Sequence, residues 1–179
     1  MNIDSLFEIA KNRQTDINEH LETLKLYASK VNHVTELGVR EGNSTVAFLA
    51  GKPKFLVSYD INHCGNRTLI AEATIKSGVQ WFFLQDNSLS CDLMPTDLLF
   101  IDTEHNYDQL IAELNRHHSK VSKYIILHDT ETFKHIGDPS SKKGLILAIN
   151  EFLDSNKEWS VKEVFTNNNG LTVLEKKDE

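Results

Sequence analysis

The stretch LLFIDTEHNYD, Leu98 to Asp108, places four apolar residues directly before a cluster of acids and an imidazole. An apolar run of this kind is typical of a strand that is buried on both faces of a parallel sheet. A second apolar run, YIILHDTETFKH from Tyr124 to His135, ends in the same chemistry. Because parallel strands place their carboxyl ends along one edge of a sheet, the two runs predict one site at that edge.

Strands alternate with helices along most of the chain, which predicts βαβ units and a parallel sheet covered by helices on both faces. The chain ends differently: WSVKEVF and LTVLEK, joined by TNNNG, are typical of an antiparallel hairpin with an Asn-Gly turn. The expected fold class is therefore α/β, with a mostly parallel sheet and an antiparallel last strand. Before the hairpin, the expected elements include strands at Val34–Leu37, Lys54–Asp60, Val79–Asp86 and Tyr124–Leu127, and helices at Ser44–Ala50 and Thr68–Lys76.

Two helices are expected before the first strand, within residues 1–31. Ser5 and Glu8 fit a capping box that would begin the first helix. Asp16 with Glu19 fits the start of the second. The 179 residues are enough for one domain with a single core, so one domain spanning residues 1–179 is expected.

The composition excludes several classes of protein. The formal net charge is -7, from 19 basic and 26 acidic residues, which argues against a general nucleic-acid or anionic-membrane binder. The longest apolar run is far shorter than the roughly 20 residues that a transmembrane helix needs. The N-terminal residues lack the basic-then-apolar order of a signal peptide. Cys64 and Cys91 form neither a disulfide framework nor a CxxC pair, so a reduced, cytoplasmic protein is expected.

A glycine-containing loop, ELGVREGNST from Glu36 to Thr45, follows the first strand and leads into a helix. Its glycines are spaced G-x-x-x-G, and Arg40 stands where a dinucleotide-binding motif needs its second glycine to make room for a pyrophosphate. The loop is therefore a poor fit for NAD. Asp60 lies about twenty residues further on, where an acid binds ribose hydroxyls in nucleotide-binding folds. Loop and acid together predict a nucleoside ligand other than a dinucleotide.

Five motifs, ELGVREGNS, YDIN, LQDNS, FIDTEHNYD and ILHDT, resemble in order and spacing those of class I, Rossmann-like, S-adenosylmethionine-dependent methyltransferases. The group they resemble most is the macrocin and cephalosporin-hydroxylase-like metal-dependent O-methyltransferases; catechol O-methyltransferase is more distant. The resemblance covers Val34 to Thr130, and FIDxxHxY followed by LHDT is its most specific part. It implies a Rossmann-like methyltransferase fold with seven strands, whose antiparallel final strand matches the terminal hairpin.

The resemblance also implies a binding site for S-adenosylmethionine. The implied contacts follow the cofactor from its methionine end to its adenine. They are Glu36, Gly38 and Gly42 with Ser44 nearby at the methionine end, Asp60 at the ribose hydroxyls, Asp86 with Asn87 or Ser88 at the adenine, and Asp102 as a neighbour of the cofactor.

In the metal-dependent members of the family, the acid matching Asp102 and a pair matching His128–Asp129 hold a divalent ion. That pair is usually Asp-Asp, Glu-Asp or Asp-Asn, so His128 departs from the pattern. The ion is left open as Mg, Mn or another metal, because imidazole suits Zn, Fe, Ni or Mn better than Mg. Thr103 also replaces the usual glycine of FIDG. Since side chains alternate faces along a strand, His128 and Asp129 both reach an ion only if the chain is already turning there.

The leading hypothesis is an S-adenosylmethionine-dependent methyltransferase that acts on a small-molecule hydroxyl, with a divalent metal as an assisting group. Asp102 is the expected metal ligand and cofactor neighbour, and His105 is the expected base. Simpler roles are also open. Asp102 could cap the next helix without binding a ligand, and His105 could pack over the site without acting as a base.

Three other functions stay open. The first is metal-independent methylation at oxygen or nitrogen with His105 as base. The second is a nucleoside-binding module without catalysis, and the third and weakest is an NAD-dependent oxidoreductase. The expected partner is a small-molecule substrate, with no nucleic acid and no membrane. A second copy of the chain could complete so small a site, as a homodimer.

Overall fold

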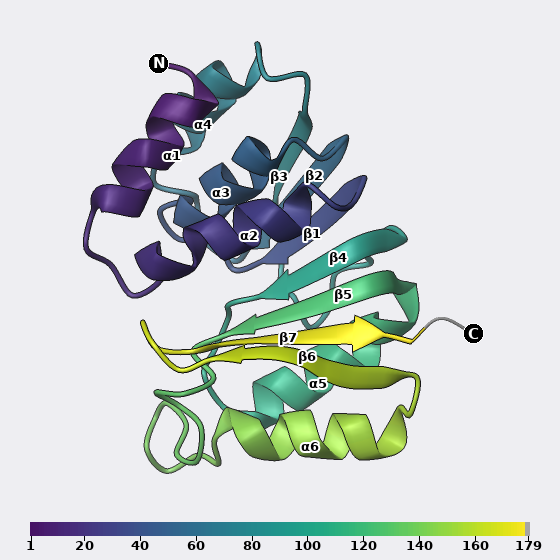
Figure 1. Ribbon diagram of the computed structural model, residues 1–179. Coiled ribbons are helices and arrows are strands. Elements are labelled where there is room, and N and C mark those ends of the chain that lie inside the picture. Colours follow the sequence, from purple (N-terminus) through teal and green to yellow (C-terminus); the bar gives the residue numbers. More distant parts are fainter. Residues whose placement is uncertain (178–179) are drawn as a thin grey trace.

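The computed structural model describes residues 1–177, and its centre is a seven-stranded sheet with the strand order β3-β2-β1-β4-β5-β7-β6. The first five strands run parallel, β7 is antiparallel to β5, and β6 is antiparallel to β7 (Figure 1). This confirms the expected α/β fold with seven strands and an antiparallel last strand. The strands are β1 (His33–Leu37), β2 (Phe55–Asp60), β3 (Gln80–Gln85), β4 (Thr96–Ile101), β5 (Val121–His128), β6 (Trp159–Phe165) and β7 (Leu171–Lys176).

Helices cover both faces of the sheet, and each face has its own apolar core. The first core joins apolar residues of α1 to α4 to one face, and the second joins those of α5 and α6 to the other. No helix of the described residues is long and apolar enough to cross a membrane. The helices are α1 (Ile3–Asn12), α2 (Leu21–Ala28), α3 (Asn43–Gly51), α4 (Arg67–Thr74), α5 (Tyr107–His117) and α6 (Leu145–Ser155), with short 3-10 turns η1 (Asn18–His20) and η2 (His118–Lys120).

The expected starts of the first two helices were wrong. Helix α1 begins at Ile3, because Asn2 is its N-cap and the Asn2 side chain accepts the Ser5 N–H at 2.8 Å. The turn η1 precedes α2, and Asp16 lies in the loop before it. There the Asp16 carboxylate pairs with the Arg40 guanidinium at 2.8 Å. A polar residue near a helix start can thus pair with a residue distant in the sequence instead of capping the helix, and a local sequence pattern does not reveal such a contact.

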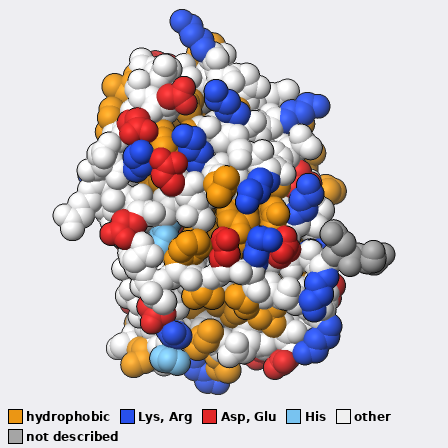
Figure 2. All heavy atoms as spheres, in the orientation of Figure 1, with side chains coloured by type: hydrophobic (Ala, Val, Ile, Leu, Met, Phe, Trp, Pro, Cys, Tyr) orange, Lys and Arg blue, Asp and Glu red, His pale blue; other side chains and the backbone are white. Residues whose placement is uncertain are grey.

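The face shown in Figures 1 and 2 is only partly covered by helices. Figure 2 shows hydrophobic side chains between charged ones where β5, β7 and β6 lie in Figure 1. Lys162 of β6 lies close to side chains of β5 and β7: its ammonium lies 5.8 Å from the centre of the Tyr124 ring and 2.7 Å from the Glu175 carboxylate. The aliphatic part of such a side chain shields apolar surface while its charge stays in water.

The sheet brings the predicted site residues to one edge. Leu37 pairs with Tyr59 and with Ile101, and Ile101 pairs with Leu127, so β1, β2, β4 and β5 end side by side. His128 pairs with Leu171 at the start of the antiparallel β7. The turn between β6 and β7 therefore also reaches this edge.

Candidate functional site

A cavity of about 430 Å³ opens at the carboxyl ends of β1 to β4. It is bordered by the loop after each of these strands, by the start of α5 and by the loop before η1. The residues predicted from the sequence that line it are Gly38, Ser44, Asp60, Asp86, Asn87, Ser88, Asp102 and His105.

Gly38 lets the end of β1 pass closely against the end of β4. Its φ is +88°, and a Cβ atom at this position would lie 1.8 Å from the Asp102 carbonyl oxygen. Its N–H donates to the Tyr59 carbonyl at 2.9 Å. Gly42, also at positive φ, is the N-cap residue of α3 and borders a second, smaller cavity of about 200 Å³ beside α1 and α4. The two glycines thus have different roles: Gly38 permits the close approach of β1 and β4, and Gly42 begins α3.

Asp60 holds the glycine loop while it lines the cavity. Its Oδ2 accepts the N–H groups of Val39 at 2.8 Å and Arg40 at 2.9 Å, and its Oδ1 accepts the Asn62 N–H at 2.8 Å. A carboxylate has about four acceptor positions, so one remains for a further donor such as a ribose hydroxyl.

Glu36 is fully buried, and its carboxylate is engaged inside the protein. It accepts hydroxyl hydrogen bonds from Ser44 at 2.6 Å, Thr45 at 2.8 Å and Ser58 at 2.5 Å. Burial raises the pKa of the Glu36 carboxyl to about 7, although the three hydroxyls favour its ionised form. These contacts tie β1 to β2 and to the start of α3, so Glu36 positions Ser44 at the cavity.

A polar network beneath α5 holds the loop after β3, where the adenine contacts were predicted. The Gln109 amide donates to Ser88 Oγ at 3.1 Å and to Glu113 at 2.8 Å, and Thr103 donates to the same buried carboxylate at 2.8 Å. The ring of His117 lies 2.7 Å from the Ser88 carbonyl. Thr103 therefore has a structural partner that explains its departure from FIDG. Sequence reasoning missed this network, although these α5 residues recur every four positions.

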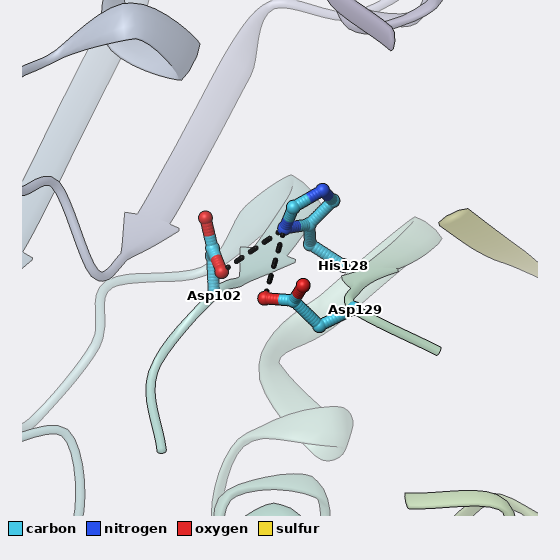
Figure 3. Close-up of side chains that lie close together, drawn as sticks. All are labelled: Asp102, His128 and Asp129. Carbon is cyan, nitrogen blue, oxygen red and sulfur yellow. Dashed lines mark hydrogen bonds and ion pairs between the residues drawn. The ribbon is translucent and has the colours of Figure 1, made fainter. Parts of the chain in front are cut away.

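Asp102, His128 and Asp129 converge at the ends of β4 and β5 (Figure 3). His128 Nδ1 lies 3.3 Å from Asp102 Oδ1 and 3.2 Å from Asp129 Oδ2. Asp129 has a φ of +61°, so the chain turns directly after β5 and both side chains of the pair face Asp102. The three predicted metal ligands are thus brought together by a turn that the strand pattern did not reveal.

His105 joins this cluster from the loop after β4. Its Nε2 lies 2.7 Å from Asp129 Oδ2, and its ring is stacked on Phe133 with 4.5 Å between centroids. Burial lowers the pKa of both imidazoles, but Asp102 and Asp129 outweigh it and raise the pKa of His105 to about 9 and that of His128 to about 10. The carboxylates therefore favour positive charge at this point of the site.

The residues present fit a divalent metal. Carboxylate oxygens and imidazole nitrogens are the ligand atoms that transition metals take in proteins. One such atom from each of Asp102, His128 and Asp129 lies within 4.8 Å of the other two. Positive charge placed among them, as a proton or a metal ion, is stabilised by the two carboxylates.

Two further contacts at the site were not predicted. The ion pair of Asp16 with Arg40 joins the loop before η1 to the glycine loop, and both residues line the cavity. The Asn169 amide, from the β6–β7 turn, donates to Asp129 Oδ1 at 2.9 Å. The run TNNNG predicts the turn, but only the fold shows that the turn supports a site residue.

The carboxylates of the cavity outnumber its cations. Among the described lining residues are six carboxylates and two cationic groups, the Arg40 guanidinium and the His105 imidazole with its raised pKa. A cleft lined with one sign of charge attracts ligands of the opposite sign. The six acids are Asp16, Glu41, Asp60, Asp86, Asp102 and Glu104.

Comparison with known proteins places the fold. No protein-family model matches the chain, and no curated protein matches its sequence. The structure is similar to an O-methyltransferase from Bacillus cereus in complex with S-adenosylhomocysteine, with 17% identity and a TM-score of 0.62 over 98% of this chain and 89% of that one. A 1,6-didemethyltoxoflavin-N1-methyltransferase from Burkholderia thailandensis, with bound 1,6-didemethyltoxoflavin and S-adenosylhomocysteine, is also similar. It gives 12% identity and a TM-score of 0.69 over 98% of this chain and 85% of that one.

A third similar structure is an S-adenosylhomocysteine-bound methyltransferase from Podospora anserina, with 14% identity and a TM-score of 0.61 over 98% of this chain and 88% of that one. At these identities the comparisons show the fold. The chain has the class I S-adenosylmethionine-dependent methyltransferase fold and resembles O-methyltransferases among other members.

Proposed function

We propose that the chain is an S-adenosylmethionine-dependent methyltransferase that acts on a hydroxyl of a small molecule, assisted by a divalent metal. One observation carries the proposal: the cavity at the carboxyl edge of a methyltransferase-type sheet is lined by the acid that ends β2 and by the acids that directly follow β3 and β4. Structures of this fold from Bacillus cereus and Burkholderia thailandensis hold S-adenosylhomocysteine. The motifs FIDTEHNYD and ILHDT favour the macrocin and cephalosporin-hydroxylase-like group.

In this proposal the loops after β1, β2, β3 and β4 each contact a different part of the cofactor. S-adenosylmethionine supplies a methyl group carried on a positively charged sulfur. Glu36 and Gly42 support the methionine end from within the fold, because Glu36 holds Ser44 and Gly42 begins α3. The acidic lining favours a sulfonium cation over a dinucleotide anion. The assigned contacts are Gly38 and Ser44 at the methionine end, Asp60 at the ribose, Asp86 with Asn87 or Ser88 at the adenine, and Asp102 beside the sulfonium.

The chain's own groups also provide for the acceptor hydroxyl. A bound divalent metal would supply a Lewis acid that lowers the pKa of such a hydroxyl. Asp102, His128 and Asp129 would hold the ion, and Asp102 also lines the cavity, so the acceptor and the cofactor would meet at this residue. Holding the two reactants in line supplies much of the rate of a group transfer. In the metal-free alternative, His105 takes the hydroxyl proton in its neutral form, which predominates above its raised pKa of about 9.

The proposal is tested by measuring S-adenosylhomocysteine formed from S-adenosylmethionine against a panel of catechols, sugar hydroxyls and amines. We expect turnover with a hydroxyl acceptor, and at least about a tenfold lower rate after treatment with a chelator, because metal assistance is worth several kcal/mol.

Each other outcome contradicts a stated part of the proposal. Turnover with amines alone would replace the hydroxyl by nitrogen as the methyl acceptor. Full activity in excess chelator would leave metal-independent methylation with His105 as base. A chain that binds the cofactor but methylates no member of the panel would be a nucleoside-binding module.

A further inference from the structure

Four ligand-type atoms at the ends of β4 and β5 form a closed ring in which carboxylate oxygens alternate with imidazole nitrogens. Asp129 Oδ2 lies 2.7 Å from His105 Nε2, which lies 3.8 Å from Asp102 Oδ1. Asp102 Oδ1 lies 3.3 Å from His128 Nδ1, which lies 3.2 Å from Asp129 Oδ2. Neighbouring ligands of one ion, each about 2.0–2.2 Å from the metal, are roughly 3 Å apart. Each neighbouring distance in the ring is therefore close to the spacing of ligands of one ion, and the atoms of Asp102, His128 and Asp129 all lie within 4.8 Å of one another.

Each of three ring members is oriented by a partner outside the ring. His128 Nε2 lies 3.2 Å from the Asp16 carbonyl, an acceptor that places the proton on Nε2 and leaves the Nδ1 lone pair facing the ring. Asp129 Oδ1 accepts the Asn169 amide, which leaves Oδ2 for the ring. The His105 ring lies nearly parallel to the ring of Phe133, at 11°. Metal ligands are oriented by outer partners in this way.

We propose that His105 is a fourth protein ligand of the metal, and that the set of two histidines and two aspartates selects a transition metal over Mg²⁺. Imidazole binds Zn²⁺, Co²⁺, Fe²⁺ and Mn²⁺, whereas Mg²⁺ takes oxygen ligands and keeps several of its waters. The inference rests on the proposed function and names the class of metal at the same site. Under it, the His105 Nε2 lone pair is used by the ion, so His105 is not the base of the reaction.

A different occupancy of the ring has to be distinguished from a metal. Two protonated imidazoles between two carboxylates would give the same alternation of atoms and a balanced charge. The two states differ in what they bind: an ion-paired ring has no free lone pair for a metal, whereas a ligand set takes up a metal and loses affinity when one ligand is removed.

The test uses the metal-free chain, titrated with Co²⁺ and separately with Mg²⁺ by calorimetry, with the visible absorption of bound Co²⁺ recorded. We expect Co²⁺ to bind more tightly than Mg²⁺ by at least two orders of magnitude, since two of four ligands are imidazoles. His105→Ala should weaken Co²⁺ binding by at least about tenfold and change the absorption spectrum. His135→Ala removes an exposed imidazole from the loop after β5 and should leave Co²⁺ affinity unchanged.

Equal affinity of wild type and His105→Ala for Co²⁺, equal affinity for Co²⁺ and Mg²⁺, or no binding of Co²⁺ would each overturn the inference. If His105→Ala does not fold, anomalous diffraction from a wild-type crystal soaked in Co²⁺ decides whether His105 Nε2 contacts the ion. S-adenosylhomocysteine affinity is measured on the same preparations. If the wild type does not bind S-adenosylhomocysteine, the proposed function is refuted. If it binds S-adenosylhomocysteine but gives one of the contrary Co²⁺ results, only the metal assignment is refuted.

Discussion

Replacing Gly38 by alanine is expected to lower the free energy of unfolding by at least about 4 kcal/mol, in the range of the most damaging point mutations. The new Cβ would lie 1.8 Å from the carbonyl oxygen and 2.6 Å from the carbonyl carbon of Asp102. Both are backbone atoms, so relief requires the ends of β1 and β4 to separate. The measurement is urea-induced unfolding of the two proteins.

Gly78→Ala is the matched control for this experiment. Gly78 has nearly the same backbone angle, with a φ of +81° against +88°, but a Cβ there meets no described atom within 4 Å. The left-handed conformation alone costs about 1–2 kcal/mol for alanine. The difference between the two variants therefore isolates the contact with Asp102. Equal losses in both variants would show that β1 and β4 do not approach each other as closely as described.

Asp60→Ala is expected to weaken S-adenosylhomocysteine binding by at least about tenfold. In the proposed function the remaining acceptor position of the carboxylate takes a ribose hydroxyl, and a hydrogen bond to a charged group contributes about 1.5–3 kcal/mol. The variant also loses the acceptor that holds the backbone of Val39 and Arg40, so part of the loss comes from the glycine loop. Calorimetry with the folded variant measures the effect.

Asp97→Ala separates the ribose contact from general loss of an acid. Asp97 Oδ2 also accepts two backbone N–H groups, from Asn32 at 2.8 Å and His33 at 3.1 Å, but it lies at the start of β4 on the opposite edge of the sheet. We expect similar losses of stability in both variants and unchanged ligand affinity in Asp97→Ala. Wild-type affinity in folded Asp60→Ala would refute the ribose role.

The fold could be predicted where apolar pattern and turn residues agree. The hairpin strands β6 and β7 have the predicted bounds, because alternating apolar residues flank an unambiguous Asn-Gly turn. The edge strand β3 was predicted at the right place, but the large apolar side chain of Phe82 within it is 51% exposed. The loop 86–95 between β3 and β4 contains no helix within the described residues. Apolar residues in a strand cannot show by themselves whether another element covers that face of the strand.

The position of the site could be predicted because parallel strands end at one edge, whatever their sequences. Its details could not, because they depend on contacts between distant residues. Asn169 lies 40 positions after Asp129, and His128 lies 112 positions after Asp16. Glu36 was assigned to the cofactor by its motif, but only the packing of α3 on β1 and β2 shows that three hydroxyls surround it.

The central claim is that the cavity binds a sulfur-containing nucleoside cofactor. Its most direct test is calorimetric titration of the wild-type chain with S-adenosylmethionine, S-adenosylhomocysteine and NAD. The acidic lining and Arg40 in the glycine loop predict that NAD does not bind. Both sulfur ligands are expected to bind with Kd values on the order of micromolar, which corresponds to a binding free energy of about -8 kcal/mol. Tighter binding of NAD than of either sulfur ligand would contradict the account.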